Sequence, residues 1–262
     1  MNIRNLIIFL FILSASACER NENFDEEQYK SYIKDKMDCM NMPRPSGLYN
    51  YPVLPGMEKW KSFTSTQEMI DACEVPTNIL QNQTTQAVFE ALWEYPFFFQ
   101  ITYRHNHYQQ DFEAVFANTN AYKEFITRND AGSCLYSRLL LVNPEVPTPI
   151  YSQGLELFMS QSNFLQQLST DEKKNIIDIS FKNDSLRQVA INYAENVSRE
   201  ITWLLIGRTL YSENYKPFVD LANNNSQLKS FLETSVINVY TIEEYNDFFS
   251  LIISHGQEFI RQ

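Results

Sequence analysis

The sequence predicts an all-α fold: a multi-helix array of about ten to twelve short helices, arranged either as an α–α superhelix or as two helical lobes. Three observations favour this class. Six glycines and ten prolines in 262 residues are too few for the many turns of a β-sandwich or barrel. Apolar residues recur at spacings of three and four, as on one face of a helix. Capping motifs precede several of these apolar segments.

Residues 1–17 have the features of a signal peptide. Arg4 supplies a positive charge, and residues 6–13 (LIIFLFIL) form an apolar run that is far shorter than the ~20 residues of a transmembrane helix. Small residues then precede Cys18, as in the lipobox of bacterial lipoproteins, although Ala15 stands where that motif usually carries leucine. We expect cleavage before Cys18 and acylation of its thiol. Plain A-x-A cleavage at the same bond, with release of a soluble protein, is the alternative.

The chain after the cleavage site predicts a membrane attachment that depends on lipid alone. Residues 18–26 form a polar, acidic tether, and residues 27–262 a single helical domain. The formal net charge of −11 is repelled by anionic membranes and by phosphate backbones, which excludes nucleic acid as a partner. We therefore expect an outer-membrane lipoprotein, at the cell surface or on the periplasmic face.

Helix signals follow one another along this domain. Residues 27–40 predict a short polar helix, and the proline-rich stretch 42–56 predicts an irregular segment that packs across a surface. Ser65, Ser169 and Thr241 each stand three residues before a glutamate, which predicts helix starts with capping boxes.

Two apolar stripes predict buried helix faces in the second half of the chain. One comprises Leu186, Ala190, Tyr193, Val197, Ile201, Leu204 and Arg208, and the other Ile242, Tyr245, Phe249, Ile252 and Phe259. The segment 143–150, with three prolines, is the candidate boundary between two lobes.

Cysteine usage allows at most one disulfide if Cys18 is acylated. Cys39, Cys73 and Cys134 then remain. Cys39 and Cys73 are the expected pair, because the irregular segment that adjoins Cys39 could lie against the helix that carries Cys73. Leucines follow Cys134, which favours a thiol packed in the core.

The sequence offers little recognisable chemistry. None of the glycines is spaced for a dinucleotide loop, a P-loop or a nucleophile elbow, and we expect no cofactor. The one metal-like pattern is His105 and His107 with Asp111. Two imidazoles and a carboxylate could hold zinc, and His107 and Asp111 would share a face of a helix. Ordinary surface histidines are the competing interpretation.

Aromatic residues supply the other candidate site. Tyr49, Tyr51, Trp93 and Tyr103 belong to aromatic-rich stretches, and exposed rings could stack on sugars or fill pockets of a partner. Packing in a helical core is the competing interpretation. Two functions therefore stay open. The favoured one is a binding or adhesion module for a glycan, peptide or protein, and the alternative is a metal-assisted hydrolase at the cell envelope.

Several short stretches follow one another in a distinctive order between residues 48 and 140. They are YNYPVLPG at 49–56, TQEMIDACEVP at 66–76, TTQA at 84–87, FEAV at 112–115 and RNDAG at 128–132. Their order and spacing resemble an uncharacterised all-helical, secreted or lipid-anchored protein family of gut-type anaerobic bacteria. The resemblance implies an all-α fold and an extracytoplasmic location, and it brings no catalytic residues.

Overall fold

The computed structural model describes residues 39, 48–102, 107–143, 149–190, 199–239 and 241–262. Every regular element in these ranges is a helix, and no strand occurs among them. The predicted all-α class is therefore confirmed, with more helical segments than the ten to twelve expected. None of the described helices is long and apolar enough to span a bilayer.

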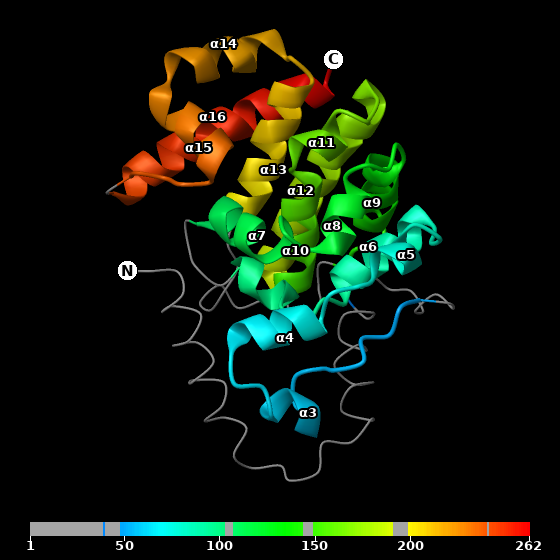
Figure 1. The fold of residues 1–262 in the computed structure, drawn as a ribbon. Coiled ribbons are helices and arrows are strands. Elements are labelled where there is room, and N and C mark those ends of the chain that lie inside the picture. The colour runs from blue at the N-terminus through cyan, green and yellow to red at the C-terminus, as the bar shows by residue number, and fades with distance from the viewer. Residues whose placement is uncertain (1–38, 40–47, 103–106, 144–148, 191–198, 240) are drawn as a thin grey trace.

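The helices keep the numbering of Figure 1. Those of the first half are α3 (Glu58–Lys61), α4 (Thr66–Ala72), α5 (Thr77–Leu80), α6 (Thr85–Trp93), the 3₁₀ helix η1 (Phe98–Thr102), α7 (Tyr108–Phe116), α8 (Asn120–Phe125) and α9 (Ala131–Leu139). Those of the second half are α10 (Pro149–Met159), α11 (Ser162–Leu165), α12 (Thr170–Ala190), α13 (Arg199–Ser212), α14 (Lys216–Asn224), α15 (Ser226–Thr234) and α16 (Ile242–Ile260).

Helix α10 lies at the centre of the molecule, beside α12 and α13 (Figure 1). All residues from 151 to 160 are buried, because α9, η1, α7 and α13 pack around this helix. Helices α14, α15 and α16 cover α13 on one side of the molecule, and α6, α8 and α9 pack together on the other (Figure 1).

The apolar face of α10 carries Phe158 into a group of buried rings. We call this group the aromatic cluster, and it comprises Phe89, Phe98, Phe112, Phe116 and Phe158. The centroid of the Phe158 ring lies 4.7 Å from that of Phe116 and 4.8 Å from that of Phe112. One turn earlier, the Phe98 ring lies against Gly154, where a Cβ atom would come within 2.6 Å of it. Only glycine leaves room for this ring.

The candidate boundary at 143–150 does not divide the core. Buried apolar side chains from both sides of this segment belong to one cluster, and α9 packs directly against α10. The irregular stretch before α3 joins the same cluster through Tyr51, Val53 and Leu54. The expectation that it packs across a surface is confirmed for the part of it that is described.

Capping accounts for the predicted helix starts, with one difference. Thr241 forms a full capping box with Glu244 at the start of α16. Ser169 and Glu172 exchange the same two hydrogen bonds before α12. At α4 the hydroxyl of Ser65 accepts from the Glu68 amide, whereas the Glu68 carboxylate accepts from the backbone N–H of Thr64.

The predicted apolar stripes need two corrections. The stripe from Leu186 to Arg208 belongs to two helices, because α12 ends at Ala190 and α13 begins at Arg199. Its members Ile201 and Leu204 are buried, and Tyr193 and Val197 lie outside the described residues. Ile242 was expected in the buried stripe of α16 but is 81% exposed, since it stands in the first turn of that helix. The helix predicted for residues 27–40 lies outside the described residues apart from Cys39, which is helical.

Candidate functional site

The polar face of α10 meets α12 and α13 in a buried group of hydrogen-bonding side chains. We call this group the polar seam, and it comprises Ser152, Glu156, Ser160, Arg187, Thr202 and Arg208, all buried except Arg208, which is half-buried. Ser152 and Glu156 of α10 and Ser160, directly after its last residue, are spaced four apart and therefore lie on one face of that helix. The opposite face of α10 points to the aromatic cluster. One helix thus separates an apolar core from a polar one.

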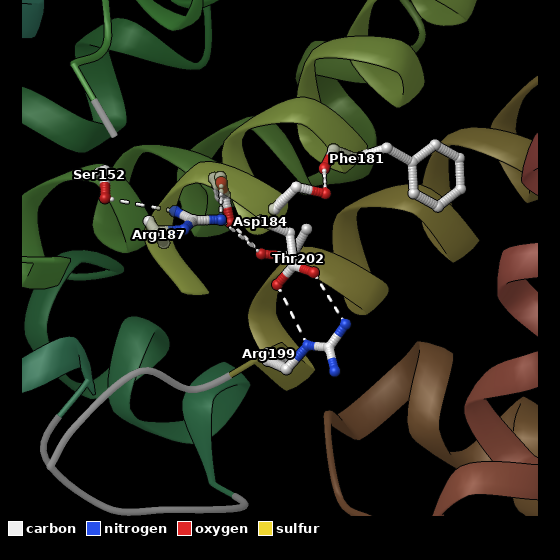
Figure 2. Close-up of polar contacts among 8 residues, drawn as sticks. Ser152, Phe181, Asp184, Arg187, Arg199 and Thr202 are labelled. Carbon is white, nitrogen blue, oxygen red and sulfur yellow. Dashed lines mark hydrogen bonds and ion pairs between the residues drawn. The ribbon is translucent and has the colours of Figure 1, made fainter. Parts of the chain in front are cut away.

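Arg187 is the centre of one end of the polar seam (Figure 2). Its Nη2 donates to Oε1 of Glu156 at 2.7 Å and to the Thr202 hydroxyl at 2.8 Å. Its Nη1 donates to the Ser152 hydroxyl at 3.3 Å, and the Thr202 hydroxyl donates to the second oxygen of Glu156 at 2.7 Å. Arg187 and Glu156 are each 1% exposed. Buried charges need this kind of pairing, because each would otherwise lose its hydration without compensation.

A second ion pair joins α12 to the start of α13. Nε and Nη2 of Arg199 donate to the two carboxylate oxygens of Asp184 at 3.2 and 2.8 Å (Figure 2). The guanidinium carbon of Arg199 also lies 4.9 Å from the centroid of the Trp203 ring, which is within cation–π range. Together with Arg187, this pair fixes how α12 lies along α13.

Arg208 occupies the other end of the polar seam and closes the end of α15. It donates from Nε to the carbonyl of Leu232 at 2.7 Å and from Nη2 to that of Glu233 at 3.1 Å. Carbonyls in the last turn of a helix lack partners within the helix, so Arg208 caps α15. Its Nη1 reaches Gln109 and Ser160. Burial lowers the pKa of Arg208 to about 10, because desolvation disfavours the charged form.

Ser235 provides the cap of α7 from a distant part of the chain. His107, at the N-cap position of α7, makes no side-chain cap hydrogen bond. Instead the Ser235 hydroxyl accepts from the backbone N–H of Gln109 at 2.9 Å. Ser235 adopts a left-handed conformation with φ of 62° and is fully buried. The end of α15 and the start of α7 are therefore joined at one residue.

The predicted metal ligands are only partly described. Asp111 is buried within α7, and its backbone N–H donates to the carbonyl of His107 at 2.9 Å, as in any helical turn. His105 lies outside the described residues. Among the residues that the structure does describe, no three His, Cys, Asp or Glu side chains lie close enough to hold a metal ion.

Two of the four candidate contact aromatics are core residues. Trp93 is 3% exposed and its ring centroid lies 4.9 Å from that of Phe98, in the aromatic cluster. Tyr51 is 4% exposed, and its hydroxyl donates to the carbonyl of Ala91 at 2.7 Å. Packing covers the faces of these two rings, which supports the competing interpretation that they pack in a helical core. Tyr49 is half-buried and Tyr103 lies outside the described residues.

The cysteines of the described part are thiols. Cys39, Cys73 and Cys134 are all free, so the expected Cys39–Cys73 disulfide is wrong. Burial raises the pKa of each of the three thiols to about 12, which keeps them protonated at neutral pH and poorly nucleophilic. Cys134 is half-buried against the core rather than fully inside it.

Comparisons of the chain with protein-family models, with curated proteins and with solved structures give no match. The resemblance over residues 48–140 stays a prediction. The contacts of the polar seam join helices to one another, because Arg187 pairs with Glu156, Arg208 binds carbonyls of α15, and the hydroxyls of the seam are engaged in hydrogen bonds. Sequence reasoning missed the seam, although the spacing of Ser152, Glu156 and Ser160 within an otherwise apolar helix could have indicated a polar face.

Proposed function

We propose that this protein is a lipid-anchored, extracytoplasmic binding module that presents its helical surface to a glycan, peptide or protein partner. The observation that carries the proposal is where the ionisable groups lie. The buried cations Arg138, Lys173 and Arg187 are each paired with a carboxylate, which is buried for Arg138 and Arg187 and half-buried for Lys173. The ionisable side chains of these three pairs therefore hold helices together, whereas an enzyme would need such groups free to act as acids or bases.

Each of these pairs is neutral, so the three cations do not offset the negative charge of the carboxylates at the surface. Exposed carboxylates include Asp178, Glu243, Glu244, Asp247 and Glu258. Such a surface repels anionic partners. A neutral glycan or a partner with a basic patch fits it better than a phosphorylated or acidic one.

The anchor is tested by the intact mass of the protein purified from membranes. The expected species begins at Cys18 and carries the mass of a diacylglyceryl group, with or without a third acyl chain. The Cys18→Ser variant should lose the lipid mass and appear in the soluble fraction. An unacylated Cys18, or a chain that still begins at Met1, would reject the anchor while leaving the binding function open.

The binding function is tested on a glycan array and on arrays of basic and acidic peptides. Binding of a neutral glycan or a basic peptide, weakened by added salt in the second case, is the expected result. Tyr49→Ala tests the one described candidate ring that is partly exposed, and Tyr49→Phe is its matched control, because it keeps the ring.

The alternative function is tested with a panel of hydrolase substrates, assayed with and without zinc. Turnover that requires stoichiometric zinc and is lost in His107→Ala would reject the binding module in favour of the metal-assisted hydrolase. Binding on the arrays without any turnover supports the module.

A further inference from the structure

Three buried hydrogen-bonding atoms on α12 have no partner. They are Oγ of Ser180, Nδ2 of Asn183 and Nε of Arg187, and their side chains are 1%, 5% and 1% exposed. The spacing of three and then four residues puts all three on one stripe of the helix. The other unpartnered buried atoms of the described part are on Gln83 before α6, on His107 before α7 and on Ser212 at the end of α13, so none of them lies on α12.

This stripe requires an acceptor. Buried polar groups are nearly always hydrogen-bonded, and a donor without a partner loses the full free energy of its hydration. Helical side chains lean towards the N-terminus of their helix, so Arg187 lies over the turn that contains Asn183. Nε of Arg187 and Nδ2 of Asn183 are therefore placed to reach one acceptor between them, with Ser180 one turn further on.

The surrounding charges define what that acceptor is. Arg187 is neutralised by Glu156, and Arg199 by Asp184, so the stripe carries no net charge that an anion would balance. The Nε of arginine and the Nδ2 of asparagine only donate, whereas the serine hydroxyl both donates and accepts. A neutral oxygen matches this set if it accepts from Nε of Arg187 and Nδ2 of Asn183 and donates to the hydroxyl of Ser180.

We propose that the stripe Ser180–Asn183–Arg187 is an internal binding site for a neutral oxygen ligand, either ordered water or the hydroxyl of a small polar solute. Such a ligand bridges donors that no protein group satisfies, as internal waters do in other proteins. It extends the polar seam along α12, and it holds Arg187 in the orientation that serves Glu156 and Thr202. The site is independent of the proposed function.

A crystal structure of the mature chain at high resolution tests the proposal. The expected result is electron density within 2.7–3.2 Å of both Nε of Arg187 and Nδ2 of Asn183. A spherical peak with an unchanged native mass identifies water, and an extended peak with added native mass identifies a solute. A site in which these two atoms contact protein acceptors, or only apolar atoms without density between them, overturns the proposal.

Two variants test the site in solution. Asn183→Leu keeps the branching of the side chain at Cγ and removes the donor, so it should abolish the density and lower the midpoint of urea unfolding. Ser185→Ala is the matched control, because its exposed hydroxyl on the same helix donates only to the carbonyl of Phe181. If Asn183→Leu does not fold, Ser180→Ala replaces it. An Asn183→Leu protein that folds and is more stable than the parent chain would show that the amide was simply unsatisfied, and would reject the site.

Discussion

The two faces of α10 stabilise the fold by different physical means. On one face Phe158 meets four other rings of the aromatic cluster, which are held by apolar burial and by ring contacts that tolerate several geometries. On the other face Glu156 meets Arg187 and Thr202 at fixed hydrogen-bond distances. The first face contributes more net free energy of folding than the second, because burial of large rings is favourable without any partner of matching polarity.

The second face contributes less net free energy to folding. Its main effect is to favour one position of α12 along α13 over others. Removing Arg187 and Glu156 from water costs about as much as their attraction returns. A sliding of α12 along α13, however, would leave both charges buried without a partner. This selection of one arrangement is a hypothesis, and the comparison of the two faces can be tested by truncating each in turn.

The largest effect is expected in the aromatic cluster. Phe158→Ala should lower the free energy of unfolding by about 3–5 kcal/mol, because it removes buried apolar area and leaves a cavity among four rings. Phe158→Leu should lose much less, since most of the volume stays. Urea unfolding followed by circular dichroism measures both. Equal losses in the two variants would mean that ring contacts, rather than volume, dominate this face.

The polar seam is expected to respond more weakly and in a non-additive way. Arg187→Met should cost about 3 kcal/mol, at the lower end for a broken buried pair, because Glu156 keeps its bond from Thr202. The double variant Arg187→Met with Glu156→Met removes both charges and should recover most of this loss. A double-mutant cycle of unfolding free energies gives the coupling. Additive losses would contradict the view that the pair mainly selects an arrangement.

This difference between the faces also explains what the sequence could predict. The all-α class and the starts of α12 and α16 were predictable, because periodicity and capping boxes such as Ser169 with Glu172 are local. For Trp93 the sequence allowed two interpretations, a buried core residue and an exposed contact residue. Only the tertiary packing decides between them. The pairing of Arg187 with Glu156 across 31 positions of the chain has no local signal beyond polar residues within an apolar helix.

The same limit applies to the cap of α7. Ser235 serves Gln109 across 126 positions, whereas sequence reasoning recognises a cap only when it directly precedes the helix. The candidate metal ligand His107 stands at this N-cap position and does not cap. The role of these residues follows from where α15 ends, which depends on Arg208.

A smaller effect is expected at this junction between α7 and α15. Ser235→Ala removes the hydroxyl that accepts from Gln109 and keeps the strained left-handed backbone, so it should cost about 1 kcal/mol, as for other lost caps. Ser235→Gly loses the same hydrogen bond but relieves the strain, and it should be less destabilising than alanine. Hydrogen exchange at the Gln109 amide reports directly on the cap. An exchange rate that is unchanged in Ser235→Ala would show that the cap does not protect this amide.

The smallest effect concerns the exposed start of α12, outside both faces of α10. Hydrogen bonds from the hydroxyl and the backbone N–H of Ser169 hold the pKa of Glu172 below its usual value. A carboxylate with a lowered pKa in the folded state stabilises the fold above its unfolded pKa and loses this contribution as the pH falls through the folded one.

Glu172→Gln keeps a hydrogen-bonding cap without the charge. The variant should therefore be slightly less stable than the parent chain at pH 7, and the difference should shrink as the pH falls below about 4.5, the usual pKa of a glutamate. Thermal unfolding of both proteins between pH 3 and pH 7 measures this. The same comparison in a Ser169→Ala background should give a smaller difference at pH 7. If the difference between the two chains stays constant across this range, the stabilisation at this cap does not come from the ionised carboxylate, and the neutral hydrogen bond alone caps the start of α12.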